Sequence, residues 1–395
     1  MTSSEGGART IGQRVAETGG RTTGFDYLRI GLALAVMVWH SFPISYGKPF
    51  ETMVLGGWAR PTVAFILPAF FALSGFLVAG SLERNTSLLR FAALRAIRIM
   101  PALGVEVLLS ALILGPLLTT VGLVAYLSDG EFHEYFLNVF GIIHFDLPGL
   151  FETNPIPRIV NGQLWTIPYE LECYAALAAL AALGLVRRPV LMLAAVTGLQ
   201  LAVMAITYQP IVFGSPLPEL GGVFSGRLLV MSFLWGVVLF RLRDRVLFSG
   251  WLAAIAAAVS VALMLVPLGD ALAPLPIAYA VAYLGLQQPR STPIVALGDF
   301  SYGIFLYGFA VQQTVASLGA WTHHWYLNLA LAVPLVTLFA AFSWYGVEKP
   351  ALAVRTRLSV LDPIDRWIGS IRTRLLAVLP WPASASGAAS KAELR

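Results

Sequence analysis

Residues 25–45 read FDYLRIGLALAVMVWHSFPIS, an apolar stretch of membrane-spanning length that carries Arg29 near its start and His40 well inside it. A helix advances about 100° per residue, so these two residues, eleven positions apart, lie on one face. With a rise of about 1.5 Å per residue, a helix that enters the membrane near Phe25 carries His40 about 22 Å into a hydrocarbon layer about 30 Å thick. Because ionisable groups are costly at that depth, His40 is a candidate functional residue.

The composition indicates a membrane protein. The 395 residues are 57% hydrophobic and only 12% charged, and apolar runs of spanning length recur along most of the chain. We therefore predict an all-α fold, a polytopic membrane helical bundle. The single cysteine, Cys173, excludes a disulfide framework and a cysteine-based metal site. No small-residue cleavage site follows the first apolar run, which predicts a retained helix and not a removed signal peptide.

The apolar runs predict about ten transmembrane helices. Between the second and third lies a short basic segment, Arg84 to Met100, and Pro101 is expected to open the third helix because proline suits a first turn. The loop at 125–161 is the longest and is long enough to be functional. The predicted spans are residues 25–46, 61–80, 101–124, 164–186, 189–208, 223–240, 248–267, 271–287, 296–316 and 326–345.

The distribution of lysine and arginine predicts the orientation. With these spans, Arg9, Arg14 and Arg21 and the other basic clusters fall on one side, whereas only Lys48, Arg60 and Arg158 fall on the other. The positive-inside rule then makes both termini cytoplasmic, and it explains the net charge of +5 without a nucleic-acid partner. We divide the chain into a disordered cytoplasmic N-terminus (1–22), a membrane domain (23–350) and a cytoplasmic tail (351–395). Residues 362–379 of that tail form either an amphipathic helix on the inner leaflet or a solvated helix.

Topology places a second ionisable group at the depth of His40. The fourth span enters from the outer side near Leu164, so Glu170 lies about 9 Å below the outer boundary and His40 about 8 Å below it. A carboxylate that meets an imidazole stabilises the imidazolium formed when the imidazole takes a proton. We therefore expect His40 and Glu170 to be catalytic. The alternative is a structural His40 that hydrogen-bonds a neighbouring backbone group or serine.

The basic segment is a second candidate site. Arg95 and Arg98 lie close to the start of a helix, where guanidinium groups and free backbone N–H groups favour phosphate. Asp26, Arg29 and Arg98 can all face the inner mouth of one cavity, about 16 Å along the helix below His40, a distance that a long flexible carrier arm spans. A basic inner stretch is also typical of a lipid-headgroup anchor or a topology signal, and this alternative stays open. Glu106 and Arg227, also in apolar spans, form a candidate structural pair.

Six motifs in order resemble the acyltransferase-3 family of integral membrane acyltransferases, which modify sugars of bacterial surface polysaccharides and related acceptors. The resemblance covers about residues 25–352. The motifs are FDYLR (25–29) with His40 eleven residues after Arg29, FFALSGFL (70–77), Arg95-x-x-Arg98 before Pro101, LWTIPYELECY (164–174), LGDFSYGIFLY (297–307) and VEKP (347–350).

The resemblance implies about ten helices, cytoplasmic acyl-CoA (usually acetyl-CoA) as donor, and a carbohydrate hydroxyl as acceptor. It makes His40 the catalytic residue and Arg29, Arg95 and Arg98 the cofactor-binding residues, with Arg29 beside the same cavity and Arg95 and Arg98 as the contacts of the CoA phosphates. Glu170 matches the glutamate after the tryptophan motif. Two departures are Gly308, where many members have a histidine, and the lack of an appended extracytoplasmic hydrolase-like domain, so transfer is expected from this chain or through a polysaccharide-assembly partner.

The sequence thus predicts an O-acyltransferase of the bacterial inner membrane. Asp26, Trp165 and Tyr169 are the expected substrate-binding residues, and no metal is expected because no metal-ligand cluster is present. The acceptor is a carbohydrate or glycolipid, such as lipopolysaccharide or exopolysaccharide, or a small secreted metabolite, and membrane lipid surrounds the bundle. A transient acyl-histidine stays an open variant of the mechanism.

Two other classes of function stay open. In a transporter, the same His, Glu and Arg residues would form a relay, although the sequence has no clear internal repeat and no paired broken helices. In a scaffold of a polysaccharide-assembly complex, these polar residues would serve only packing.

Overall fold

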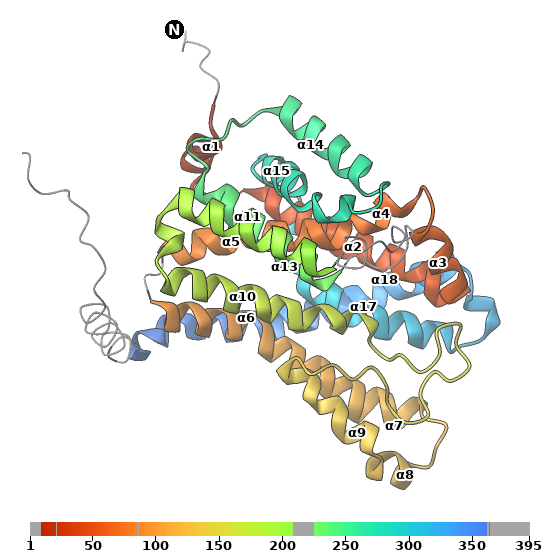
Figure 1. Cartoon of the computed structure of the whole chain (residues 1–395). Helices are drawn as coiled ribbons and strands as arrows, with labels where there is room; N and C mark the ends of the chain where they lie inside the picture. The colour runs from red at the N-terminus through yellow and green to blue at the C-terminus, as the bar shows by residue number, and fades with distance from the viewer. Residues whose placement is uncertain (1–8, 21, 85–86, 208–224, 362, 364–395) are drawn as a thin grey trace, which may run out of the picture.

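The computed structural model describes residues 9–20, 22–84, 87–207, 225–361 and 363, and every regular element in these ranges is helical. The structure contains a set of long helices, most of which run side by side in roughly one direction (Figure 1). They are α2 (Thr23–Tyr46), α5 (Ile66–Arg84), α6 (Leu88–Leu109), α10 (Ile167–Ala182), α11 (Pro189–Thr207), α13 (Gly226–Arg241), α14 (Gly250–Leu263), α15 (Pro274–Gly285), α17 (Ser301–Ala316) and α18 (Trp325–Phe342).

Shorter elements connect or extend these helices. The short α-helices are α1 (Ile11–Thr18), α3 (Lys48–Leu55), α4 (Arg60–Ala64), α7 (Gly115–Leu118), α8 (Leu123–Ser128), α9 (Gly130–Tyr135), α16 (Pro293–Ala296) and α19 (Lys349–Ala353). Two π-helical segments, η1 (Ser110–Leu114) and η7 (Ser343–Glu348), continue α6 and α18. The 3₁₀ segments are η2 (Phe136–Phe140), η3 (Gly162–Thr166), η4 (Leu185–Arg187), η5 (Gly269–Ala271), η6 (Ala320–Thr322) and η8 (Val354–Leu361).

The chain is a multi-pass membrane protein by the length and composition of its helices. Five helical stretches in the described ranges are long and apolar enough to span a membrane: 23–46, 60–84, 88–118, 189–206 and 325–358. Each of the ten segments predicted from the sequence contains a helix, and the number ten itself stays a prediction. Large apolar side chains on α11, α14 and α18 are exposed, among them Leu201, Ile255 and Leu338, as expected for faces that meet lipid.

The core centres on α5 and α13. Nearly all of α13, from Leu228 to Phe240, is buried, as expected of a helix that is apolar on every side. Glycines let the two backbones touch, because a Cβ at Gly75 would overlap the carbonyl of Phe233 and one at Gly236 would overlap the carbonyl of Ala72. Small residues at helix crossings are the usual device where lipid supplies no hydrophobic drive for helix association.

A second apolar cluster joins α2 to α17 and α18. Ala33 and Met37 of α2 pack with Ile304 of α17 and with Ala332 and other small or branched residues of α18. One face of α2 is therefore fixed against these helices. This contact holds the helix that carries Arg29 and His40.

The N-terminal segment differs from the expectation of disorder. Ile11–Thr18 form α1, whose first turn is closed by a capping box between Thr10 and Gln13. Ile11 is fully buried, and its backbone N–H donates to the carbonyl of Val246, beyond the end of α13. A reciprocal cap and a buried apolar residue stabilise a short helix that composition alone does not reveal. The predicted tail segment 362–379 lies outside the described residues except for residue 363.

The expectation that Pro101 opens a helix was wrong. It lies inside α6, which starts at Leu88, where the Ser87 hydroxyl accepts a hydrogen bond from the backbone N–H of Arg90. Proline is tolerated within membrane helices because neighbouring groups replace the lost backbone contacts. The basic segment is therefore the first part of a long helix, and Arg95 and Arg98 lie well within it and not at its start.

The predicted long loop is partly helical. Its first part forms α8, α9 and η2, which project with α7 beyond the main bundle at the lower right of Figure 1. Its second part, residues 141–161, is irregular and returns to the bundle, where the side-chain amide of Asn154 donates to the backbone carbonyl of Gln313 in α17. The polar loop therefore covers the end of the bundle opposite to α1.

Candidate active site

Two cavities inside the bundle share part of their lining. We name them inner and outer after the orientation predicted from the basic residues. The inner cavity has a volume of about 660 Å³ and extends to Gly20 and Thr22, at the start of α2. The outer cavity has a volume of about 460 Å³ and lies farther along α2. Three side chains line both and form what we call the neck: Leu67, Thr166 and Phe305.

The inner cavity is strongly basic. Its charged lining residues are Asp26, Arg29, Arg84, Arg95, Arg98, Glu170 and Arg355. The described lining thus contains five arginines and only two carboxylates. All three arginines predicted to contact a cofactor line this cavity, together with the predicted substrate contact Asp26.

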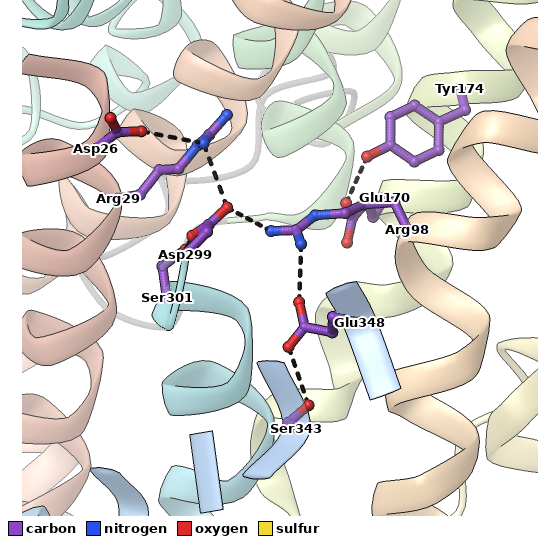
Figure 2. A network of polar contacts seen from close by, with 9 residues as sticks. All are labelled: Asp26, Arg29, Arg98, Glu170, Tyr174, Asp299, Ser301, Ser343 and Glu348. Atoms are coloured by element: carbon purple, nitrogen blue, oxygen red, sulfur yellow. Dashed lines mark hydrogen bonds and ion pairs between the residues drawn. The ribbon is translucent and has the colours of Figure 1, made fainter. Parts of the chain in front are cut away.

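Arg98 is the centre of an ion-pair network (Figure 2). Its Nη2 lies 2.7 Å from Oδ2 of Asp299, just before α17, and its Nη1 lies 2.8 Å from Oε2 of Glu348, at the end of η7. Arg29 of α2 approaches the same Asp299 oxygen at 3.4 Å and Asp26 at 3.7 Å. The network ties α2, α6, α17 and α18 together at the inner cavity.

Two hydroxyl groups fix the carboxylates of this network. The Ser301 hydroxyl donates to Oδ1 of Asp299 at 2.5 Å, and the Ser343 hydroxyl donates to Oε1 of Glu348 at 3.0 Å. Ser343 and Glu348 are the first and last residues of the π-helical segment η7, and such segments are frequent at functional sites. Neither Asp299 nor Glu348 was a predicted site residue, although Asp299 lies in the motif LGDFSYGIFLY and Glu348 in the motif VEKP. Because a buried arginine needs acidic partners, the carboxylates in these two motifs were candidates to pair with Arg98.

Arg95 lies in a different setting from Arg98. Its guanidinium carbon is 5.8 Å from the ring centre of Tyr174 and 6.0 Å from that of Phe91. No acidic group in the described ranges forms an ion pair with it, and its buried Nε has no hydrogen-bond partner. Aromatic faces hold an arginine while leaving the in-plane N–H groups free for an anion.

Glu170 belongs to the inner cavity. Its Oε1 accepts a hydrogen bond of 2.6 Å from the Tyr174 hydroxyl, one turn along α10 (Figure 2). Thr166, one turn in the other direction, is a neck residue. Glu170 therefore lies on the inner side of the neck, close to it along the helix.

His40 belongs to the outer cavity. Its ring packs edge-on against Phe309 of α17, with ring centres 5.1 Å apart. No polar partner for its ring nitrogens is present among the described residues, so the hydrogen bond to backbone or serine that the alternative, structural role of His40 requires is not formed. Trp165 lines the same cavity, whereas Tyr169 packs on Trp165 and against Gly226 and lines neither cavity.

The predicted partnership of His40 and Glu170 is not made in this structure. The two residues line different cavities, and no hydrogen bond or ion pair joins them within the described ranges. Equal depth fixes only one coordinate, and rotation of α10 turns Glu170 towards the arginines. Nor does Glu106 pair with Arg227; it accepts hydrogen bonds from Ser110 and Asn161.

The outer cavity has its own charged groups. Lys48 and Glu51 of α3 line it beside His40, and neither was a predicted site residue. Burial raises the pKa of Glu51, and the charge of Lys48 opposes this shift. These groups give the outer cavity hydrogen-bonding capacity suited to a polar ligand.

The backbone at Gly308, where many family members have a histidine, lies close to α2. A Cβ at this position would lie 3.0 Å from Cγ of Met37 on α2, three residues before His40. A larger side chain there would need Met37 to move. Within the described ranges, no group of histidine, cysteine, aspartate and glutamate side chains is arranged to hold a metal ion.

Comparison with known proteins identifies the family. The chain is 30% identical over 385 residues to nodulation protein 10 of Rhizobium leguminosarum bv. viciae, covering 88% of this chain and 98% of that protein. It is 28% identical over 351 residues to the O-acetyl transferase of Shigella phage Sf6, covering 82% of this chain and 94% of that protein. No solved structure matches it. Residues 22–348 match the acyltransferase-3 family model, described as an acyltransferase domain, so the chain belongs to this family of acyltransferases.

Proposed function

We propose that this acyltransferase transfers an acetyl group from cytoplasmic acetyl-CoA to a hydroxyl group of a carbohydrate or glycolipid. The observation that carries the proposal is the pair of cavities: one is rich in arginine, the other contains His40, and they share the neck residues Leu67, Thr166 and Phe305. This arrangement suits a long donor with an anionic end and a reactive thioester at the other. A relative described as an O-acetyl transferase supports the acetyl group.

The chemistry would take place where the two cavities meet. The imidazole of His40 takes the proton of the acceptor hydroxyl while that oxygen attacks the thioester carbonyl carbon. The new C–O bond forms, the C–S bond breaks, and the imidazolium returns the proton to the leaving thiolate. The products are the ester and CoA. His40 suits a base because no other polar group in the described ranges occupies its ring nitrogens.

Glu170 would act on the donor side and not as the direct partner of His40. Its Oε1 is held by Tyr174, and it lies one helical turn from the neck residue Thr166. A carboxylate there can accept hydrogen bonds from the amide groups of a pantetheine arm that leads to the neck. Asp26, with Arg29 at the start of α2, would shape the entrance for the donor.

The outer cavity would receive the acceptor. Trp165 provides an aromatic surface of the kind that packs on sugar rings, and Lys48 and Glu51 supply hydrogen bonds to hydroxyl groups. Tyr169 would support Trp165, on which it packs. We place the protein in the bacterial inner membrane, with the arginine-rich cavity towards the cytoplasm and the His40 cavity towards the acceptor side, as the basic residues predict.

The experiment compares surface glycans and glycolipids of a bacterial host that carries the wild-type chain, the His40→Ala variant or neither. Mass spectrometry should find an added acetyl group only with the wild-type chain, and the variant should accumulate in the membrane without it. Purified wild-type protein should also hydrolyse acetyl-CoA slowly in detergent, without any ion gradient, which a transporter relay would not do. An unchanged acetylation pattern with His40→Ala would reject the mechanism.

A further inference from the structure

The arginines of the inner cavity fall into two classes. Arg29 and Arg98 are paired with carboxylates, whereas Arg84, Arg95 and Arg355 form no ion pair with an acidic group in the described ranges. All five line the same cavity. The sequence predicted the same role for Arg95 and Arg98, whereas in the structure Arg98 is paired with carboxylates and Arg95 is not.

Arg98 is held too firmly to serve a ligand. Glu348, one of its two partners, is only 2% exposed, and the Arg98 side chain is 22% exposed. A phosphate that took Arg98 away would leave the Glu348 carboxylate buried without a counter-charge, which is strongly destabilising. The carboxylates of Asp299 and Glu348 would also repel an anion that approached Arg98 directly.

Arg95, by contrast, lines the cavity without an ion-pair partner in the described ranges. It is half-buried between the rings of Phe91 and Tyr174, and its Nε is buried without a hydrogen-bond acceptor. Buried polar donors in proteins are nearly always satisfied by protein, water or ligand. A phosphate oxygen in the cavity is an acceptor that suits the planar fork of arginine.

Two further arginines stand where the cavity reaches the surface. Arg84, at the end of α5, and Arg355, in η8, are both exposed and line the same cavity as Arg95. Their positions at the ends of two different elements give separate points of positive charge near the entrance. One cation deep in the cavity and two at its mouth match a ligand that carries phosphate groups at more than one place.

We propose that Arg84, Arg95 and Arg355 bind the phosphate groups of the donor, and that Arg98 is a positioning residue that holds α6 to α17 and α18. The proposal rests on the proposed function, because it assumes a nucleotide-linked donor in the inner cavity. It differs from the sequence expectation in removing Arg98 from the phosphate site and adding two arginines that stand in none of the quoted motifs.

The test measures binding of CoA, dephospho-CoA and pantetheine to the purified full-length protein in detergent. Pantetheine keeps the flexible arm and has no phosphate, so the ratio of its Kd to that of CoA reports the phosphate contacts. Arg95→Ala should lower this ratio about tenfold, the loss expected for one charge-assisted hydrogen bond. Arg84→Ala and Arg355→Ala should each lower this ratio severalfold. Dephospho-CoA lacks only the 3′-phosphate of CoA, so a variant that binds CoA and dephospho-CoA with equal affinity has lost the contact to that phosphate.

Arg98 gives the opposite pattern. Arg98→Lys keeps the charge and should weaken CoA and pantetheine by the same factor, with the ratio unchanged and a lower Tm. Glu348→Gln should act in the same way and serves if the Arg98 variant is unstable. Arg90→Ala, which removes a charge from the same helix outside the cavity lining, is the matched control and should leave the ratio unchanged.

The outcomes separate this proposal from the proposed function. A ratio that collapses in Arg98→Lys or Glu348→Gln and survives in the Arg84, Arg95 and Arg355 variants would overturn the division of the arginines. Equal binding of CoA and pantetheine by the wild-type protein would overturn it as well, while leaving a thioester donor in place. If the wild-type protein bound neither, the donor named in the proposed function would be wrong, and the phosphate site would fall with it.

Discussion

At the scale of single residues, His40 carries the strongest expectation. Its ring lies in the outer cavity with Phe309 on one side and no polar partner in the described ranges. His40→Ala should lower acyl transfer at least about 100-fold, the lower range for loss of a general base. Acetyl transfer in membrane vesicles measures this. His133→Ala, in α9 beyond the main bundle, is the matched control, and similar activity in both variants would contradict the role of His40.

Glu170 gives a second prediction at this scale. If it serves the donor, Glu170→Gln should raise the KM for acetyl-CoA and leave the pH at which His40 titrates in the rate profile unchanged. A carboxylate in direct contact with the imidazole would instead move that pH, because its charge favours the imidazolium. Tyr174→Phe, which removes the 2.6 Å hydrogen bond to Glu170, should cause a smaller change in the same direction. A shifted pH profile in Glu170→Gln would restore the partnership expected from the sequence.

These residues show what the sequence could and could not predict about the site. Arg29 and His40 lie in one apolar run, so helical geometry alone predicts that they share a helix and a face and lie at different depths. Whether Glu170 faces His40 depends on how α10 is rotated about its own axis, and the depth of a residue in the membrane does not define that rotation. Asp299 and Glu348 are far from Arg98 in sequence and meet it only through packing of α6, α17 and α18.

At the scale of elements, the crossing of α5 and α13 depends on glycine. A side chain at Gly75 would overlap the backbone carbonyl of Phe233, which cannot move without separating the helices. Gly75→Val should therefore destabilise the protein by at least about 1–3 kcal/mol, the usual cost of overpacking. Gly104→Ala in α6 meets nothing within 4 Å and is the control. Thermal unfolding in detergent measures both, and equal Tm values would contradict this crossing.

The neck predicts the choice of acyl group. Phe305 lines both cavities and packs on Phe70, so its ring occupies space where the two cavities meet. Phe305→Ala should raise the rate with butyryl-CoA relative to acetyl-CoA by about tenfold or more, since one methylene in an apolar pocket is worth about 1–3 kcal/mol. Phe300→Ala, near the start of α17 and outside both linings, is the control. An unchanged preference for acetyl-CoA would show that the acyl group does not pass Phe305.

Element boundaries show a further limit of the sequence. Hydropathy located a helix in each of ten segments, because an apolar run of spanning length has few other stable forms in lipid. It did not reveal that α6 continues through Pro101, since the groups that compensate for a proline come from other elements. The π-helical segments η1 and η7 are equally hidden, because hydropathy does not distinguish a π-helical turn from an α-helical one.

At the scale of the whole molecule, the described ends of the chain lie at one end of the bundle. In Figure 1, α1 and η8 are both at the left, whereas α3 and the loop 141–161 are at the right. Backbone contacts agree, since Ile11 bonds to Val246 and Gly47 lies against Pro155. This arrangement fits the prediction that residues before α2 and after α18 share one side of the membrane. The sidedness itself follows only from the arginines, because a helical bundle has no intrinsic inside.

The single buried cysteine makes that prediction measurable. Cys173 is fully buried, so the wild-type chain should give little background with a membrane-impermeant maleimide. Thr153→Cys, in the exposed part of the loop 141–161, should be labelled in intact spheroplasts, because the basic residues predict that this loop faces the acceptor side. Arg245→Cys, exposed beyond the end of α13, should be labelled only after the membrane is opened. The reverse pattern would place the arginine-rich cavity on the outer side, where no acyl-CoA reaches it, and would reject both the orientation and the donor.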